Sequence, residues 1–200
     1  VVFVNSDEEI GSPGSTDALA GLARRSARAF VLEPSLGLEG ALKTSRKGAT
    51  RYDVEIKGRS AHAGLDPAAG SNAIVILAEV VRRLFGLNEP ERGVSVNVGL
   101  IEGGTRPNVI PESARAVVDV RTPTKAEANR IDERLQNIRI PAERGSISIT
   151  RSGGRPPMEV TAESRALWQD AHRAAGVLGF HLEQAKAGGV SDGNTTSQYY

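Results

Sequence analysis

Hydrophobic residues change their spacing several times along the chain, and each change predicts a different element. Two short apolar runs near the start, Val1–Asn5 and Ala29–Leu32, are typical of buried strands, and acidic residues follow each of them. Between these runs Ser15 or Thr16 is suited to cap a short helix that continues to about Arg24. Strands that end in carboxylates favour a parallel α/β sheet, in which ligands gather beyond the carboxyl ends of the strands.

From about residue 47 the spacing becomes that of a second, compact domain. Alternating apolar residues and helical repeats predict these elements in chain order: strand 52–56, helix 74–85, strands 94–98 and 114–120, helix 125–137 and strand 147–149. This β-α-β-β-α-β order is the ferredoxin-like split. Beyond it, a helix around Trp168 and a short strand at 180–182 are expected. The fold class is therefore α/β, with a ferredoxin-like domain over 47–154 that interrupts an α/β domain made of 1–46 and 155–200.

Composition excludes several classes of function. The chain has 25 basic and 24 acidic residues, a net charge of +1, and no long block of like charge. Aromatic residues make up 4%. The chain therefore lacks both the strong positive electrostatic field and the aromatic stacking surfaces that favour nucleic-acid binding. The absence of cysteine excludes disulfides, thiolate zinc sites and cysteine nucleophiles. The longest apolar run, 73–78, is too short to span a membrane. We expect neither a nucleic acid nor a membrane as partner.

The two ends indicate a piece of a longer protein. The chain begins inside an apolar run without a Met and ends just after a glycine-rich loop, whereas natural termini tend to be polar and mobile. A cytoplasmic location is favoured, but the true N-terminus is not in this sequence, so the compartment stays open.

Acidic residues at the predicted strand ends are the first candidates for chemistry. Glu8 and Glu9 are adjacent, so their side chains diverge, and one could bind a metal while the other holds a water as general base. Glu33 closes the next predicted strand and is a second candidate ligand. Each acid alone is also explained by a solvated loop or a turn cap. Acids that close two successive strands indicate a chemical site more strongly than either acid does alone.

Four further residues are candidates for contacts with a ligand. His62 lies in a loop of small residues, where a ligand can approach the imidazole closely, and Asn108 offers a donor in a glycine-rich turn. Arg121 closes a predicted strand and Arg155 lies at the exit from the insert, where a guanidinium suits bidentate binding of a carboxylate. The simpler alternatives are an exposed loop histidine and ordinary surface arginines.

Several of these segments occur together in a recognisable order. The pattern resembles the M20 family of metallopeptidases, and most closely its glutamate carboxypeptidase branch. The resemblance covers nearly the whole chain, and several motifs in order are more specific than any single one. The segments that carry it are 1–12, 32–34, 58–64, 108–111, 119–121 and 188–192.

The resemblance implies a zinc-dependent hydrolase that acts on an N-acyl amino acid or a peptide. Glu8 matches the general base, while Glu9 and Glu33 match ligands of one zinc each. His62 matches the lid histidine that polarises the scissile carbonyl, often across a dimer. The inserted domain matches the family's lid or dimerisation domain, which implies a homodimer through residues 47–154. Its substrate-holding residues match Asn108, Arg121 and Arg155.

The sequence also departs from the family pattern. The His-x-Asp motif and the bridging aspartate would precede Val1, and the last histidine ligand would follow Tyr200. We therefore expect an active parent protein and an inactive chain. The alternatives are an aminoacylase, a deacylase of the acetylornithine or succinyl-diaminopimelate type, an N-carbamoyl amidohydrolase, or a non-catalytic dimerisation module.

Overall fold

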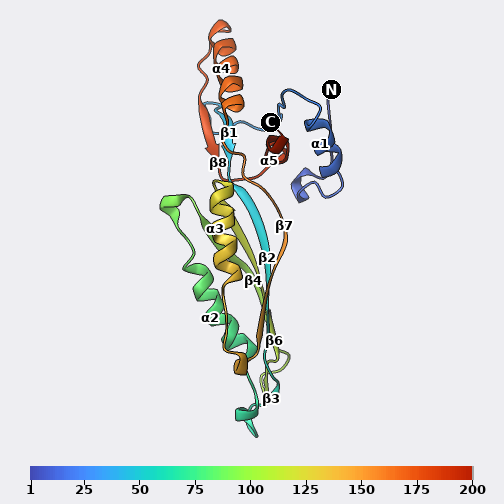
Figure 1. Ribbon diagram of the computed structural model, residues 1–200, viewed down its shortest axis with the longest axis vertical. Helices are drawn as coiled ribbons and strands as arrows, with labels where there is room; N and C mark the ends of the chain where they lie inside the picture. The colour runs from blue at the N-terminus through green and yellow to red at the C-terminus, as the bar shows by residue number, and fades with distance from the viewer. Residues whose placement is uncertain (200) are drawn as a thin grey trace. The chain divides into compact units, whose positions relative to one another are not determined.

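The computed structural model describes residues 1–199, and the chain divides into two compact units. Figure 1 labels most helices and strands of both. We describe each unit by itself. No helix in the described residues is long and apolar enough to cross a membrane. Unit 1 comprises Val1–Ala49, Thr122–Lys125 and the chain from Gly154 onward, and unit 2 comprises Thr50–Arg121 and Ala126–Gly153.

Unit 2 is built on a four-stranded sheet with the spatial order β4-β6-β2-β7. Along the chain, two helices alternate with its strands in the order β-α-β-β-α-β, so the expected ferredoxin-like arrangement is confirmed. Figure 1 shows α2 and α3 on one side of the sheet. The elements are β2 (Gly48–Lys57), α2 (Ala73–Phe85), β4 (Ser95–Gly103), β6 (Ser113–Thr122), α3 (Lys125–Gln136) and β7 (Ser146–Arg155). The domain limits at 46/47 and 154/155 remain our proposal.

The core of unit 2 follows directly from the spacing of its hydrophobic residues, which is every second residue in strands and every third or fourth in helices. Every second residue of β2 is buried, from Tyr52 through Val54 to Ile56, and these meet the buried stripe of α2 and α3. The carboxamide of Asn72 caps α2 by accepting hydrogen bonds from two backbone N–H groups. The Tyr52 hydroxyl donates to Asp132 at 2.7 Å, and burial raises the pKa of this tyrosine.

Unit 2 also contains a small pair of strands that the sequence does not predict. β3 (Ala61–His62) pairs antiparallel with β5 (Val109–Ile110), inside segments expected to be loops. Two residues are too few for an alternating pattern to be visible in the sequence.

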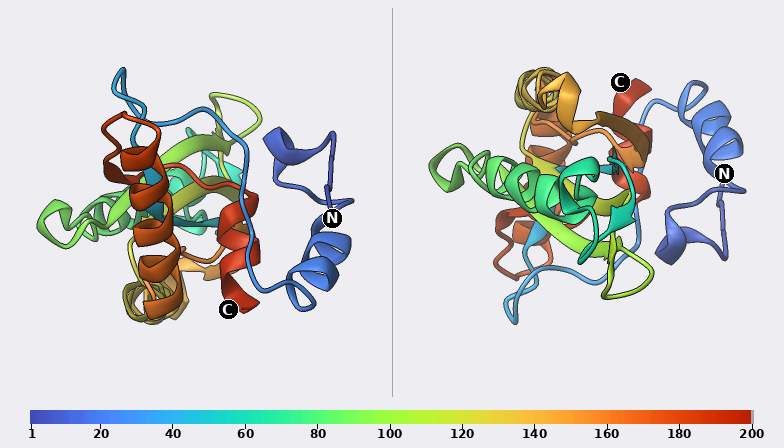
Figure 2. Two further views of the ribbon diagram at one scale, coloured as in Figure 1. Left: turned by 90° about the horizontal axis from the view of Figure 1, so that it is seen from above. Right: turned by 90° about the horizontal axis from the view of Figure 1, so that it is seen from below.

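Unit 1 contains two strands, three helices and several short 3-10 turns. β1 (Leu42–Arg46) and β8 (Gln184–Ala187) form a parallel pair. The helices are α1 (Thr16–Ala23), α4 (Ala162–Val177) and α5 (Asp192–Thr196). α1 contacts α5, and α4 contacts β1 (Figure 2). The 3-10 turns of residues 1–199 are Glu8–Ile10, Pro67–Ala69, Pro90–Arg92, Ala142–Arg144 and Ser197–Tyr199.

The predictions of three strands in unit 1 are wrong. Residues 1–5, 29–32 and 180–182 are not in strands, and none of the described strands pairs with them. Without a partner, a strand leaves its backbone groups unpaired. Their side chains are largely open to solvent, including Val2 at 90% and Leu32 at 97% exposure. The strands that do form, β1 and β8, carry mixed polar residues and gave no apolar signal.

A buried asparagine joins the two chain segments that flank the insertion of unit 2. Asn194 is fully buried in α5, and its amide nitrogen donates to the carbonyl oxygens of Lys47 at 3.0 Å and Pro156 at 2.9 Å. Its side-chain oxygen accepts from the backbone N–H of Ser191 at 2.9 Å. All three polar contacts of the amide are therefore made inside unit 1.

We expect Asn194→Asp to destabilise the protein, although the shape of the side chain is unchanged. The new oxygen would face two carbonyl oxygens, and leaving such buried groups unsatisfied costs roughly 1–3 kcal/mol, and more for an ionised group. Urea unfolding followed by circular dichroism measures this loss. Asn129→Asp, at an exposed position of α3, is the control and should change stability little. Equal stability of the two variants would contradict the role of Asn194.

Candidate functional site

The segment 5–16 of unit 1 is a compact loop around the acidic triplet. Glu8 begins a single 3-10 turn, which ends at Gly11 with φ 95°. Ser12 follows with φ 55°, the only positive φ of a non-glycine residue in the described chain, and it is fully buried. Such a conformation persists only where the surroundings hold it in place.

Asp7, the first acid of the triplet, has a structural role in this loop. Its carboxylate accepts hydrogen bonds from the Ser15 hydroxyl at 2.6 Å and from the backbone N–H groups of Gly14 and Ser15. The Ser15 hydroxyl is the main cause of the lowered pKa of Asp7. Ser15 does occupy the N-cap of α1, but its hydroxyl binds Asp7 instead of the helix.

Glu8 is held by the guanidinium of Arg155, which comes from the end of β7. The Nη1 atom of Arg155 donates to Glu8 Oε1 at 2.9 Å. Its Nη2 atom donates to Ser12 Oγ at 2.7 Å and to Asp192 Oδ1 at 2.9 Å. Arg155 is only 6% exposed, so these are contacts of a buried charge. The expected substrate arginine thus contacts the expected general base.

Glu33 and Glu9 differ sharply in their surroundings. Glu33 forms an ion pair with the buried Arg46 of β1 and lies 4.0 Å from the Lys43 ammonium. Glu9 is exposed. Across residues 1–199, no group of three or more histidine or acidic side chains is arranged to hold a metal ion. The acids described here therefore do not fit a two-zinc site as they stand.

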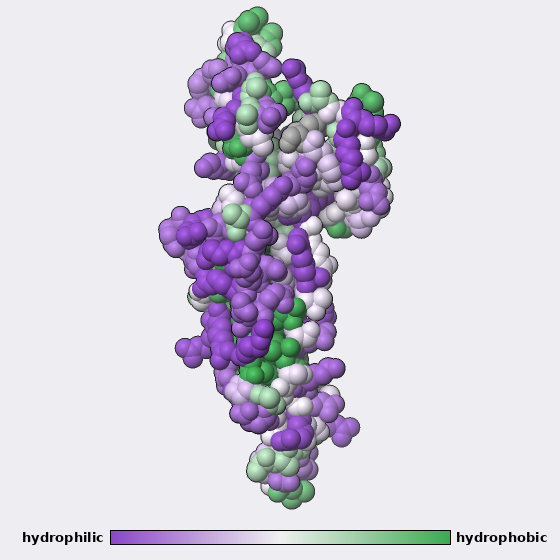
Figure 3. All heavy atoms as spheres, in the orientation of Figure 1, coloured by the Kyte–Doolittle hydropathy of each residue, from purple (hydrophilic) through white to green (hydrophobic). Residues whose placement is uncertain are grey.

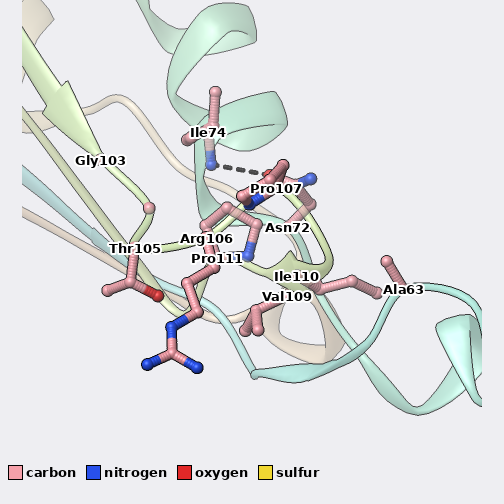
Figure 4. A pocket seen from close by; sticks show the side chains of 11 residues that line it. Ala63, Asn72, Ile74, Gly103, Thr105, Arg106, Pro107, Val109, Ile110 and Pro111 are labelled. Carbon is pink, nitrogen blue, oxygen red and sulfur yellow. Dashed lines mark hydrogen bonds between the residues drawn. The ribbon is translucent and has the colours of Figure 1, made fainter.

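In unit 2 the structure brings His62 and Asn108 together. His62 lies in β3 opposite Val109, and the backbone N–H of Ala63 donates to the carbonyl oxygen of Asn108 at 3.0 Å. The sequence placed both residues in loops and gave no reason to expect this pairing. A hollow lies beside the pair (Figure 4). Its lining includes Ala63, Ile74 and Pro107, while the Arg106 side chain extends away from Ala63.

The ring of His62 is fixed by its own backbone. The Nδ1 atom accepts from the N–H groups of Gly64 at 3.1 Å and Leu65 at 3.2 Å. A ring nitrogen that accepts cannot carry the proton, so the neutral ring is the Nε2–H tautomer. The exposed side of His62 is therefore a hydrogen-bond donor.

Arg121 lies in the four-stranded sheet, at the end away from the β3–β5 pair. It pairs with Ser95 at the start of β4, whereas Ala114, near the β3–β5 pair, lies opposite Gly103 at the end of β4. At about 3.3 Å per residue, Ala114 and Arg121 are about 23 Å apart. The Arg121 guanidinium binds Asp119 of its own strand at 2.6 Å. The structure therefore does not bring Arg121 together with His62 and Asn108.

Two residues of the Arg155 network were not among the candidates from the sequence. Asp192 and Ser12 sit in glycine-containing segments that resembled family motifs, but nothing in their spacing showed a shared partner. Only the fold brings positions 12, 155 and 192 into contact.

The structure combines an α/β unit with an inserted ferredoxin-like domain, and sequence comparison identifies the family. The profile of the peptidase dimerisation domain matches residues 44–144, half of the chain. The chain therefore belongs to the M20 peptidase family, as its motifs indicate.

Individual relatives support the same assignment. Carboxypeptidase G2 of Pseudomonas sp. (strain RS-16) is 29% identical over 94% of this chain and 46% of its own length. Acetylornithine deacetylase of Myxococcus xanthus is 29% identical over 70% of this chain and 38% of its own length. The crystal structure of aminopeptidase PepT from Bacillus cereus ATCC 10987 shares the fold, with a TM-score of 0.73 and 22% identity over 94% of this chain and 52% of that one. The chain thus spans about half the length, or less, of these curated relatives.

His62 and His172 should carry the proton on different ring nitrogens, which directly tests the hydrogen bonds assigned to their rings. His62 should show the Nε2–H form, because its Nδ1 accepts two hydrogen bonds. His172 should show the Nδ1–H form, because its Nδ1 faces the carbonyl oxygen of Leu182 at 3.2 Å. Two-bond ¹H–¹⁵N correlation spectra at alkaline pH, assigned with His62→Gln and His172→Gln, distinguish the two forms. The same pattern for both histidines would contradict the assignment.

Proposed function

We propose that the chain is part of a zinc-dependent hydrolase that cleaves the amide bond of an N-acyl amino acid or of a C-terminal residue, as a glutamate-type carboxypeptidase does. The observation that carries the proposal is the similarity to carboxypeptidase G2 over 94% of this chain, because a match of that length extends over both units. The family's dimerisation domain supports it independently.

In this proposal each residue has one task in amide hydrolysis. Glu8 takes a proton from the attacking water and delivers it to the leaving nitrogen. The Nε2–H group of His62 donates to the carbonyl oxygen as negative charge develops there. Asn108 and Arg121 hold the substrate and its carboxylate, since amide and guanidinium groups are the appropriate donors. Arg155, for which the sequence predicts the same task, is 6% exposed and instead contacts Glu8, Ser12 and Asp192.

Zinc belongs to the proposal because the resemblance assigns Glu9 and Glu33 as ligands, and M20 peptidases are generally metal-dependent. Zinc would supply Lewis-acid activation of water and carbonyl. Glu33 can take this role only if its ion pair with Arg46 opens. We derive no catalytic step through the metal, because the described residues do not assemble its site.

A second candidate is a deacylase of the acetylornithine type, which the Myxococcus xanthus relative favours. A non-catalytic dimerisation module is the alternative of a different class. Hydrolysis by the full-length protein of acyl-glutamate, acyl-aspartate and acetyl-ornithine, with and without chelator, separates the three. A preference for acyl-glutamate that chelation abolishes supports the carboxypeptidase, and no turnover of any substrate supports the module.

The partner in the proposal is a second copy of the chain, bound through residues 47–154. Strand β4 is an edge of the four-stranded sheet, and an exposed edge is a template for pairing with another strand. Leu100 and Ile101 of β4 are about 60% exposed, and Ile74 and Val75 of α2 are also exposed. Figure 3 shows apolar side chains gathered on one face of unit 2.

Replacing Glu8 by Gln should abolish turnover and leave the metal content of the full-length protein nearly intact. The reason is that Glu8 handles only the proton, and losing a general base costs ~10²–10⁴-fold in rate. Steady-state kinetics and elemental analysis on the same samples measure both effects. The exposed Glu39→Gln is the control and should match the wild type. Loss of zinc in Glu8→Gln would make Glu8 a ligand instead.

Residues 47–154, produced alone, should fold and self-associate. The core of unit 2 lies entirely within this span, so folding needs no side chain from unit 1. Circular dichroism tests folding, and sedimentation tests the dimer. Leu100→Lys/Ile101→Lys should give a folded monomer, because charge on an edge strand opposes pairing. The control Leu65→Lys, at an 82% exposed loop position, should stay dimeric. An unfolded span refutes the domain limits, whereas a folded monomer refutes only the dimer.

A further inference from the structure

We infer that Asp192 is a positioning residue for Glu8 and acts through Arg155. The carboxylate of Asp192 binds one terminal nitrogen of the guanidinium, and the other terminal nitrogen binds Glu8. Asp192 does not contact Glu8 in the described structure; it fixes the group that does. This inference rests on the proposed function, in which Glu8 is the general base.

The guanidinium of Arg155 has few other anchors. Its Nε atom is buried and is the single buried side-chain nitrogen or oxygen without a hydrogen-bond partner in residues 1–199. The orientation of the group therefore depends on the contacts of Nη2 with Asp192 and Ser12. Because a guanidinium is planar and rigid, fixing Nη2 also fixes the direction in which Nη1 donates to Glu8.

Asp192 is itself held firmly enough to serve as the anchor. It is 7% exposed and lies at the start of α5. Its Oδ1 accepts from the Ser12 hydroxyl at 2.7 Å, and its Oδ2 accepts from the Asn5 amide at 2.9 Å. Both oxygens therefore have partners besides Arg155. The left-handed backbone at Ser12 places the hydroxyl between the two charged groups.

The charges explain why the anchor has to be an anion. Arg155 carries one positive charge and contacts two carboxylates, so Asp192 competes with Glu8 for the same guanidinium. Without the charge of Asp192, the planar fork of Arg155 is free to turn both terminal nitrogens toward Glu8, the preferred geometry for a carboxylate. Glu8 would then lose the position from which it takes the proton.

The first test is the steady-state kinetics of Asp192→Asn in the full-length protein. We expect kcat to fall at least 10-fold while KM changes less than 3-fold, because the substitution keeps the shape but removes the charge. The control is Asp170→Asn, since Asp170 also pairs with an arginine but its side chain is 42% exposed. It should match the wild type. An unchanged kcat in Asp192→Asn, or a change confined to KM, overturns the inference.

A double-variant cycle with Arg155→Met separates positioning from a purely structural effect. Both single variants should lower Tm, and the double variant should lose less than the sum of their losses, because it removes both members of the buried pair. Its kcat should equal that of Arg155→Met alone, since Asp192 acts only through Arg155. Additive losses of kcat, or recovery of kcat along with Tm, contradict the inference.

The outcomes also separate this inference from the proposed function. A wild-type full-length protein without hydrolytic activity refutes the proposed function and with it the role of Asp192 in turnover. Wild-type activity with an unaffected Asp192→Asn variant refutes only the inference. The Tm cycle reports the coupling of positions 155 and 192 in either case.

Discussion

One buried positive charge determines how the N-terminal part of unit 1 is built. A guanidinium removed from water must be paired and hydrogen-bonded, because an uncompensated buried charge is strongly destabilising. Arg155 meets this requirement with three groups, Glu8 and Ser12 of the acidic loop and Asp192 of α5, which come from two segments far apart in the sequence. The acidic loop, the start of α5 and the end of β7 are thereby tied together. Even the left-handed backbone of Ser12 follows from this requirement, since its hydroxyl binds both ions.

A second constraint comes from inserting one domain into another. Apart from Thr122–Lys125, the chain leaves unit 1 after Ala49 and returns at Gly154, so two separate segments must keep a fixed spacing inside unit 1. The amide of Asn194 bridges their carbonyl oxygens. Asn194 and Asp192 both belong to the short helix α5. The same glycine-flanked segment thus holds the insertion point and the guanidinium beside Glu8.

The sequence predicts unit 2 and the helices α1 and α4 of unit 1 well, but it predicts the strands of unit 1 poorly, for a physical reason. In unit 2 each strand and helix buries one face against a core made by the unit itself, so periods of 2 and 3.6 appear in the sequence. In unit 1 the apolar runs 1–5 and 29–32 have no strand partner, while the mixed residues of β1 and β8 do pair. The candidate residues could be named from motifs. Their contacts could not, because the pairing of Glu8 with Arg155 depends on the fold.

The geometry of unit 2 bears on the proposed dimer. Arg121 lies about 23 Å from Ala114 along β6, at about 3.3 Å per residue, and Ala114 is at the end of the four-stranded sheet near the separate β3–β5 pair that carries His62. A sheet with a packed core does not bend enough to close such a distance. If both Arg121 and His62 contact one small substrate, as we propose, a single copy of unit 2 is insufficient. One of the two must then come from a second copy, which gives the dimerisation domain a direct part in building the site.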